Sequence, residues 1–228
     1  AGVDDTTGRF AQGAAVEGPA GSLGGGMREG IMAAFAEANA AGGVHGRQIT
    51  LESFDDGYEP DRSIEHVRKV IDGGNFLGLI GPVGTPTSKA TQPLATEAAV
   101  PFVGPFTGAG FLRDAALTNV MNVRATYAAE TETWIAHLVD ELGMQNIALL
   151  YQDDGVGRVG LNGVTAARER RGMELSATGT YTRNTTAVKS ALLDIRKAKP
   201  DAVVMVGAYK PIAEFIRLSR KLKFDPTF

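Results

Sequence analysis

Short apolar runs alternate with amphipathic helical patterns along the whole chain, and this alternation most constrains the possible fold. The run at residues 76–80 is too short for a buried helix and ends in a glycine-rich loop, which favours a strand. Between such runs, apolar side chains recur at helical spacing, for example Ile64, Val67 and Val70. Strands connected through helices run parallel. The sequence therefore predicts an α/β fold made of parallel sheets flanked by helices.

The regular alternation of predicted strands and helices is interrupted near residues 119–125, which suggests a boundary between two lobes. We expect an N-terminal α/β lobe at residues 1–120 and a second α/β lobe at residues 121–228. The final residues, 223–228, are typical of a loop that enters another strand. We therefore expect the second lobe to be incomplete, with a C-terminal part of the natural protein absent.

Three local expectations follow from the pattern of the individual helices. The helix after residues 81–88 is expected to begin at Ser88. The basic stretch at residues 168–171 is typical of a solvated helix end, where cations favour the C-terminal dipole. A long helix is expected over residues 125–142, with one face in a core formed by Trp134, Ile135, Leu138, Val139 and Leu142.

Composition excludes several classes of function. The 228 residues carry a net charge of −3, so the chain has no excess of positive charge for binding nucleic acid. There is no cysteine, so disulfides, cysteine–metal sites and thiol catalysis are excluded. No apolar run approaches the roughly 20 residues that a transmembrane helix needs. The first residues show no signal peptide, as expected of a mature, processed chain or of a cytoplasmic one.

Two glycine-rich loops that carry hydroxyl groups follow neighbouring predicted strands. They lie at residues 81–88 and 104–108, and they contain Thr85 and Thr107. In open α/β sheets, ligands bind at the carboxyl ends of the strands. Helix N-termini there favour an anion such as a carboxylate. Each threonine could hold such an anion or could simply cap its own helix.

Two pairs of aspartates also follow predicted strands, Asp55–Asp56 and Asp153–Asp154. They could be paired catalytic carboxylates or a metal site, but helix N-terminal charge and turn chemistry are far commoner reasons for such pairs. For Asp153 and Asp154, a polar contact with a ligand stays open. The three histidines show no metal-binding spacing, so we expect no metal and no cofactor.

An ordered set of short motifs extends over essentially the whole chain. It resembles the leucine/isoleucine/valine-type periplasmic binding proteins, which are ABC transporter solute-binding proteins with the two-lobed type I periplasmic binding fold. The matching stretches, in order, are residues 17–30, 38–47, 55–60, 80–82, 101–105 and 199–203.

This resemblance implies an extracytoplasmic, periplasmic solute-binding protein of an ABC uptake transporter, without enzymatic activity. The implied ligand is a small carboxylate, either an amino acid or an amino-acid-like or aromatic carboxylate, bound in the cleft between the two lobes. The implied partners are permease subunits in the membrane, with no nucleic acid. A ligand-sensing domain of a receptor or regulator on the same fold is the alternative, and an α/β enzyme is a third possibility.

The resemblance also implies which residues contact the ligand. Gly108 stands where the family carries a hydroxyl that accepts from an ammonium group, and Phe106 is bulkier than the usual residue. Tyr209 matches an aromatic residue of the second lobe that closes over the ligand. The full implied set is Leu23, Thr85, Phe106, Thr107, Gly108, Val156 and Tyr209.

Overall fold

A computed structural model describes residues 2–228 and divides the chain into two compact units, Ala1–Arg124 and Ala125–Phe228. We call these the first lobe and the second lobe. The division falls after Arg124 because the short strand Val120–Met121 still pairs with the first sheet. Among the described residues, no helix combines the length and the apolar character needed to cross a membrane.

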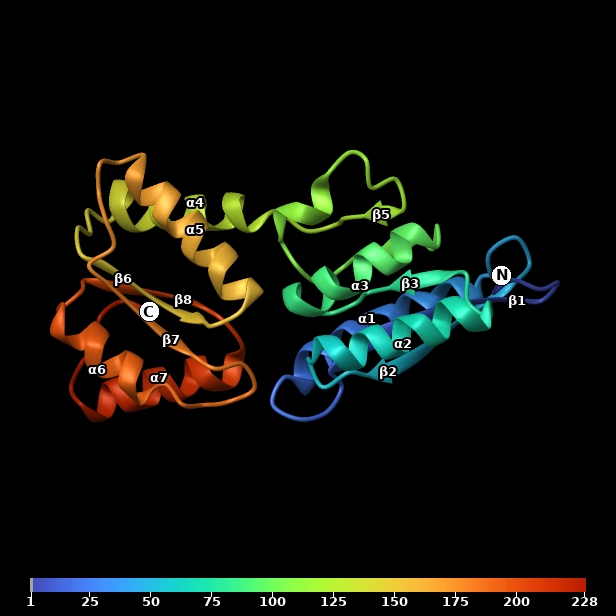
Figure 1. The fold of residues 1–228 in the computed structure, drawn as a ribbon, viewed down its shortest axis with the longest axis horizontal. Helices are drawn as coiled ribbons and strands as arrows, with labels where there is room; N and C mark the ends of the chain where they lie inside the picture. Colours follow the sequence, from blue (N-terminus) through green and yellow to red (C-terminus); the bar gives the residue numbers. More distant parts are fainter. Residues whose placement is uncertain (1) are drawn as a thin grey trace. The chain divides into compact units, whose positions relative to one another are not determined.

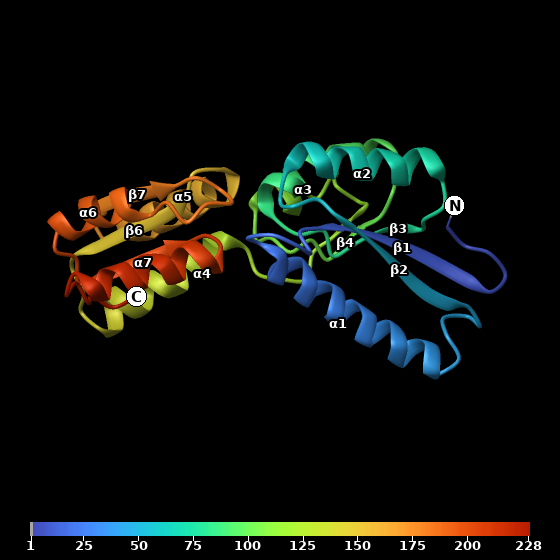
Figure 2. The ribbon, with the colours of Figure 1, turned by 90° about the horizontal axis from the view of Figure 1, so that it is seen from below.

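The first lobe is a parallel sheet covered by helices on both faces. Its strands lie in the order β2-β1-β3-β4-β5, and every paired neighbour is parallel. Figure 2 shows α1 on one face of this sheet and α2 and α3 on the other. The elements are β1 (Thr7–Ala14), α1 (Gly21–Ala40), β2 (Gln48–Asp55), α2 (Pro60–Gly73), β3 (Gly78–Ile80), α3 (Thr85–Glu97), β4 (Phe102–Val103), a 3-10 turn (Gly110–Arg113) and β5 (Val120–Met121).

The core of the first lobe lies between the sheet and the α2–α3 layer. Leu79 and Phe102, which are partners in the β3–β4 register, are almost inaccessible to solvent. They pack with Val67 and Val70 from the predicted apolar stripe of α2. Burial of such side chains contributes about 1.5–3 kcal/mol each relative to exposure.

The second lobe is a smaller parallel sheet in the strand order β7-β6-β8. Figure 1 shows α4 and α5 on one face of this sheet and α6 and α7 on the other. The elements are α4 (Tyr127–Ile135), a π-helical continuation (Ala136–Glu141), β6 (Ile147–Gln152), α5 (Gly155–Glu169), β7 (Ala177–Tyr181), α6 (Lys189–Lys197), β8 (Ala202–Val206) and α7 (Tyr209–Lys221). The predicted α/β fold with parallel sheets is thus confirmed.

The central strand β6 supplies both cores of the second lobe. Successive side chains of a strand point to opposite faces of its sheet. Ile147 and Leu149 accordingly pack under α4 and α5, whereas Ala148 and Leu150 pack under α6 and α7. Because both faces are covered, β6 reads as a continuous apolar run rather than an alternating one.

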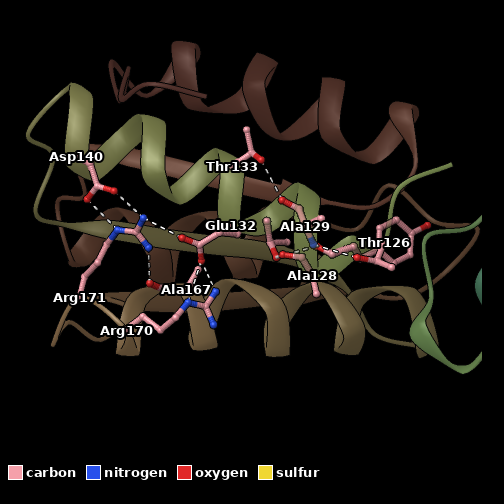
Figure 3. Close-up of polar contacts among 11 residues, drawn as sticks. Thr126, Ala128, Ala129, Glu132, Thr133, Asp140, Ala167, Arg170 and Arg171 are labelled. Carbon is pink, nitrogen blue, oxygen red and sulfur yellow. Dashed lines mark hydrogen bonds and ion pairs between the residues drawn. The ribbon is translucent and has the colours of Figure 1, made fainter. Parts of the chain in front are cut away.

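Ion pairs join α4 to α5 (Figure 3). Arg171 donates to Asp140, at 2.8 and 2.6 Å, and also pairs with Glu132 at 2.9 Å. Arg170 forms a second ion pair with Glu132. These guanidinium groups lower the pKa of both carboxyl groups. At the N-terminus of α4, the Thr126 hydroxyl caps the helix by accepting from the Ala129 N–H.

The predicted core face of α4 is only partly right. Ile135 and Val139 are buried as expected, but Trp134 is 38% exposed and Leu142 is 51% exposed. Trp134 lies in the regular α-helical part next to Ile135, about 100° around the helix from it. Leu142 follows the π-helical turns Ala136–Glu141, whose wider winding breaks the regular α-helical spacing. Trp134 and Leu142 instead line a surface hollow of about 600 Å³ beside β8.

The basic end of α5 is only partly the expected solvated helix end, because Glu169 and Arg170 are exposed but Arg168 is not. Arg168 is 2% exposed, and its Nη2 donates to the carbonyl oxygens of Gln145 (2.7 Å) and Glu174 (2.9 Å). Burial lowers the pKa of this guanidinium. Arg168 therefore ties the loops before β6 and before β7 to the end of α5.

A glycine in the first turn of one helix of each lobe allows that helix to touch the end of a strand. A Cβ added at Gly24 of α1 would overlap the carbonyl oxygen of Ala15, which follows β1. A Cβ added at Gly157 of α5 would overlap the carbonyl oxygen of Gln152, the last residue of β6. Each lobe thus uses the same close approach of backbone to backbone.

We predict that Gly24→Ala and Gly157→Ala each destabilise the protein by about 1–3 kcal/mol, because backbone atoms must move apart to admit the methyl group. Gly30→Ala is the matched control, since nothing lies within 4 Å of its added Cβ in the middle of α1. This control should stabilise by about 0.5–1 kcal/mol through helix propensity. Urea unfolding measures all three, and equal effects at Gly24 and Gly30 would contradict the close approach.

The α4–α5 ion pairs predict a pH dependence of stability. Since the folded-state pKa values of Glu132 and Asp140 are lowered, their contribution is present above the ordinary values of 4.5 and 3.8. It is lost as the pH falls through the lowered folded-state values. Arg171→Met should therefore reduce the melting temperature at pH 7 and make its decrease toward pH 3 less steep. Lys197→Met, which removes an exposed pair with Asp194, should change neither; an identical pH profile for Arg171→Met would contradict the assignment.

Candidate ligand-binding site

The loops after β3 and β4 run side by side at the carboxyl edge of the first sheet. Phe106 N–H donates to the carbonyl oxygen of Pro82 at 2.8 Å, and Val83 and Phe106 form a parallel bridge beyond the strand ends. Gly84 holds the turn into α3 with a φ of 108°, and a Cβ there would overlap the ring of Tyr58. These backbone contacts hold the two loops together just before Thr85 in the first loop and Thr107 in the second.

Thr85 and Thr107 meet at this edge. Their Oγ1 atoms lie 2.7 Å apart, and Thr107 Oγ1 also accepts from the Ala109 N–H at 3.1 Å. Both side chains are almost fully buried. The mutual bond uses one of the two hydroxyl protons, so the pair retains one proton for a further acceptor.

Thr85 is not the N-cap of its helix. The helix begins at Thr85 rather than at the expected Ser88, and Gly84 occupies the cap position without a side-chain bond. The Thr85 hydroxyl is therefore directed to Thr107 rather than to the amides of its own helix. The capping interpretation of Thr85 is wrong, and the anion-binding interpretation stays a prediction.

Ser88 adds a further polar group on the same side of α3. Residues three apart share a face of a helix, so Ser88 lies on the face of Thr85. Its hydroxyl is fully buried and has no hydrogen-bond partner among the described residues. A buried polar group without a partner is uncommon in folded proteins.

An open pocket of about 320 Å³ adjoins the second loop. Its lining combines the predicted residues Leu23 and Phe106 with Ser22, Gly26 and Met27 from the first turns of α1. Phe106 is 37% exposed. Thr85, Thr107 and Gly108 do not line this pocket, and all three are buried.

Two arginines that sequence reasoning missed surround the second loop. Arg113 donates to the carbonyl oxygens of Thr107 (3.2 Å), Ala109 (2.6 Å) and Arg124 (3.1 Å). The Cζ atom of Arg124 lies 5.4 Å from the centroid of the Phe106 ring. Nothing in the sequence pattern connects Arg124 with Phe106, because their contact depends on the path of the chain through β5.

In the second lobe, Val156 and Tyr209 stand at the N-termini of α5 and α7, after the neighbouring strands β6 and β8. Asp154 caps α5 by accepting from the Val156 N–H at 3.0 Å. It also accepts from Gln152 Nε2 at 2.7 Å and pairs with Arg183 at 3.2 Å. The structure therefore gives Asp154 a positioning role beside Val156.

Tyr181 organises the other side of this edge. Its hydroxyl donates to Gln152 Oε1 at 3.2 Å and accepts from the Ala208 N–H at 2.9 Å, directly before Tyr209. Burial raises the pKa of Tyr181 to about 12, so this hydroxyl keeps its proton. The Tyr181–Gln152 bond links the ends of β6 and β7, and the bond from Ala208 attaches the start of α7 to them.

The aspartates at the end of β2 serve the local structure. Asp55 accepts from the N–H groups of Val16 (3.0 Å) and Gly57 (3.3 Å); although burial opposes the shift, these bonds lower its pKa. Asp56 is buried, which raises its pKa, and it accepts from Ser63 and the Tyr58 N–H. Among the described residues, no three acidic or histidine side chains group as metal ligands.

Two larger hollows of the second lobe lie away from the predicted site residues. The 600 Å³ hollow is lined by residues of β8 and by Trp134. Another, of about 920 Å³, lies along the end of α6 and the final residues of the chain, including Lys197 and Lys223. Neither includes Val156 or Tyr209. The larger hollows of the second lobe therefore do not coincide with its predicted ligand contacts.

Comparison with known proteins decides the family. The family profile described as "Periplasmic binding protein" matches residues 13–227. The chain belongs to the periplasmic binding protein family. The resemblance to the leucine/isoleucine/valine type is confirmed by "Leu/Ile/Val-binding protein homolog 7" of Brucella abortus (strain 2308), which is 24% identical over 92% of this chain and 54% of its own length.

Solved structures agree with this assignment. A possible leucine/isoleucine/valine-binding protein from Rhodopirellula baltica SH 1 is 38% identical, with a TM-score of 0.91, over 98% of this chain and 62% of that chain. A fatty acid ABC transporter substrate-binding protein from Thermomonospora curvata has the same fold, with a TM-score of 0.90 at 20% identity, over 99% of this chain and 57% of that chain. This periplasmic binding protein chain spans about half the length of the curated relatives it matches.

The hydroxyl pair predicts an asymmetric response to substitution. Thr107→Val would leave both the Ala109 N–H and the Thr85 hydroxyl without a partner, at a cost of about 1–3 kcal/mol. Thr85→Val should cost less, because Thr107 would still accept from Ala109. The double variant should cost less than the sum of the two, since the residues share one bond.

Urea unfolding of the three variants measures these costs. The exposed Thr50 of β2 gives the control Thr50→Val, which should stay within about 0.5 kcal/mol of the parent. Strictly additive effects at Thr85 and Thr107 would show that the two hydroxyls do not interact.

Proposed function

We propose that this chain is the ligand-binding part of an extracytoplasmic solute-binding protein of an ABC uptake transporter. Its ligand is a small molecule that carries a carboxylate. Its protein partner is the permease of that transporter. The observation that carries the proposal is the buried Thr85–Thr107 hydroxyl pair at the carboxyl edge of a parallel sheet.

The start of α3 is suited to a carboxylate. The first amide N–H groups of a helix have no partner within the helix, and the N-terminal end of the helix dipole is positive. Thr85 opens α3. Pro86 has no N–H, and the Ser88 N–H donates to the carbonyl oxygen of Gly84, so the N–H groups of Thr85 and Thr87 are the ones left without a partner in the helix. Together with the proton that the threonine pair retains, they form a set of neutral donors for an anion.

The names of the relatives support a carboxylate without specifying its carrier. The matched relatives are named for leucine, isoleucine and valine, and one structural neighbour is named for a fatty acid. These molecules share a carboxylate attached to an apolar body. The pocket beside Phe106 and Leu23 suits an apolar body of this kind.

We infer a binding role rather than a catalytic one. The acidic side chains at the strand ends that could act as bases are engaged elsewhere: Asp55 and Asp56 with backbone N–H groups, Asp154 with Arg183. The Ser63 hydroxyl does donate to Asp56 at 2.7 Å, but both side chains are almost fully buried and serve the turn into α2. In the second lobe, Val156 and Tyr209 are proposed as further ligand contacts.

A thermal-shift and calorimetric screen of the 228-residue chain tests the proposal. The panel contains aliphatic and aromatic carboxylates, amino acids and the corresponding amides. A bound carboxylate at about 100 times its Kd should add about 2.7 kcal/mol of stability. The amide, which lacks the anion, should bind at least about tenfold more weakly.

Variants assign the site. Thr85→Val should weaken carboxylate binding by about tenfold, because it removes a donor, and Phe106→Ala should change affinity or preference among apolar bodies. Thr50→Val is the control and should leave binding unchanged. A flat response to every carboxylate, or equal affinity for the matched amides, would contradict the proposed function.

A further inference from the structure

The side chain of Tyr58 contacts neighbouring loops at the carboxyl edge of the first sheet. Tyr58 follows β2 and is only 5% exposed. It packs with Ala15 and Ala20, which belong to the segment between β1 and α1. A Cβ added at Gly84, in the loop after β3, would overlap Cε2 of the Tyr58 ring and lie 2.9 Å from Cδ2. Since the strand order is β2-β1-β3, one side chain extends from its own loop past the loop of β1 to the loop of β3.

A buried carboxylate holds Tyr58 in a backbone conformation that few residues other than glycine adopt. The φ of Tyr58 is 63°, in the left-handed region. Asp56 accepts from the Tyr58 N–H at 2.8 Å and from the Ser63 hydroxyl at 2.7 Å. The N–H of Asp56 donates to the carbonyl oxygen of Ala14, at the end of β1, at 3.2 Å. Backbone strain of this kind persists where the surrounding structure fixes it, and it is frequent at ligand sites.

Gly84 connects the Tyr58 ring to the candidate site. It directly precedes Thr85, the first residue of α3. The carbonyl oxygen of Gly84 accepts from the Ser88 N–H at 3.1 Å, and its N–H donates to the carbonyl oxygen of Phe106 at 3.4 Å. A shift of Gly84 would therefore move the Thr85 hydroxyl on one side and disturb the loop of Phe106 on the other.

The ring also supports one wall of the first-lobe pocket. Leu23 packs against the cluster that contains Tyr58, and it lines the 320 Å³ pocket together with Phe106. Tyr58 itself does not line this pocket. Its influence on a ligand is therefore indirect and passes through Leu23 and Gly84.

We propose that Tyr58 is a positioning residue for carboxylate recognition, because its ring holds the Gly84–Thr85 turn against the neighbouring loops. This inference rests on the proposed function and adds a residue to its site. Without the ring, Gly84 loses its support on that side, and the start of α3 can shift. The Thr85 hydroxyl and the Thr87 N–H then lose their fixed placement, and donors displaced by about 1 Å hold an anion much less well.

Acid and amide pairs test this role. 4-Methylpentanoate is compared with 4-methylpentanamide, and 3-phenylpropionate with 3-phenylpropanamide, by calorimetry on the 228-residue chain. The ratio of the two Kd values in each pair measures how well the donors fit the anion. Tyr58→Ala should reduce this ratio by about fivefold or more, because the turn that carries the donors is no longer held. Tyr58→Leu, which keeps an apolar side chain without the ring, should have the same effect and serves if the alanine variant does not fold.

Controls separate positioning from stability. Tyr58→Phe keeps the ring and should retain most of the ratio. Val67→Ala removes buried apolar atoms from the α2 core of the same lobe; it should lower the melting temperature but leave both Kd values of each pair unchanged. In the Thr85→Val background, Tyr58→Ala should have little further effect on the Kd of the acid, since both changes act on the same donor.

Hydrogen exchange of the ligand-free chain gives a readout that needs no ligand. The Ser88 N–H bonds to Gly84, whereas the Leu79 N–H bonds to Pro101 inside the sheet region. In Tyr58→Ala, exchange at Ser88 should accelerate at least about tenfold relative to Leu79, because the turn opens locally. In Val67→Ala, the two rates should change together.

The outcomes distinguish this inference from the proposed function. An unchanged acid–amide ratio in Tyr58→Ala and Tyr58→Leu, or exchange at Ser88 and Leu79 that accelerates equally in Tyr58→Ala, would overturn the inference and leave the proposed function standing. A parent chain that binds no carboxylate of the wider panel would overturn the proposed function together with the role of Tyr58 in binding.

Discussion

The parallel register between β3 and β4 determines where the side chains of the candidate site meet. Leu79 pairs with Phe102 inside the sheet, and the same register continues past the strand ends to Val83 and Phe106. Because the two loops leave the sheet in step, the next polar residues, Thr85 and Thr107, come within hydrogen-bonding distance. The site is thus a consequence of strand pairing, and its precision depends on a core that lies elsewhere in the lobe.

In both lobes, the start of a helix packs directly against the backbone at the end of a strand. At Gly24 and at Gly157, the absence of a Cβ lets a helix start against a strand-end carbonyl. A carboxylate then holds each edge together: Asp55 binds the N–H groups of the loop after β1, and Asp154 caps α5. The two aspartate pairs that follow strands in the sequence thus have a structural role at Asp55 and at Asp154. Both aspartates serve the scaffold that presents the loops.

The sequence predicted what local pattern controls and missed what the path of the chain controls. Periodicity located the strands and helices, and glycine-rich loops after strands identified Thr85 and Thr107. It placed Leu142 in the core, because a regular α-helix was assumed where the helix becomes π-helical, and it placed Trp134 there although only its neighbour Ile135 is buried. Arg168 could not be recognised as buried, since its carbonyl partners come from two separate loops. Arg124 escaped notice for the same reason.

In the first lobe, the buried polar groups of the candidate site are neutral and the charged groups are only half-buried, which is consistent with the cost of burying charge. A buried counter-ion for a carboxylate would pay a large desolvation penalty before any ligand arrives. Here the buried donors are the neutral hydroxyls of Thr85 and Thr107, which satisfy each other at 2.7 Å and keep one proton to donate. The full charges, Arg113 and Arg124, stay half-buried around the loop, where solvent still reaches them. In the proposed site, neutral donors can then hold an anion without a buried counter-ion.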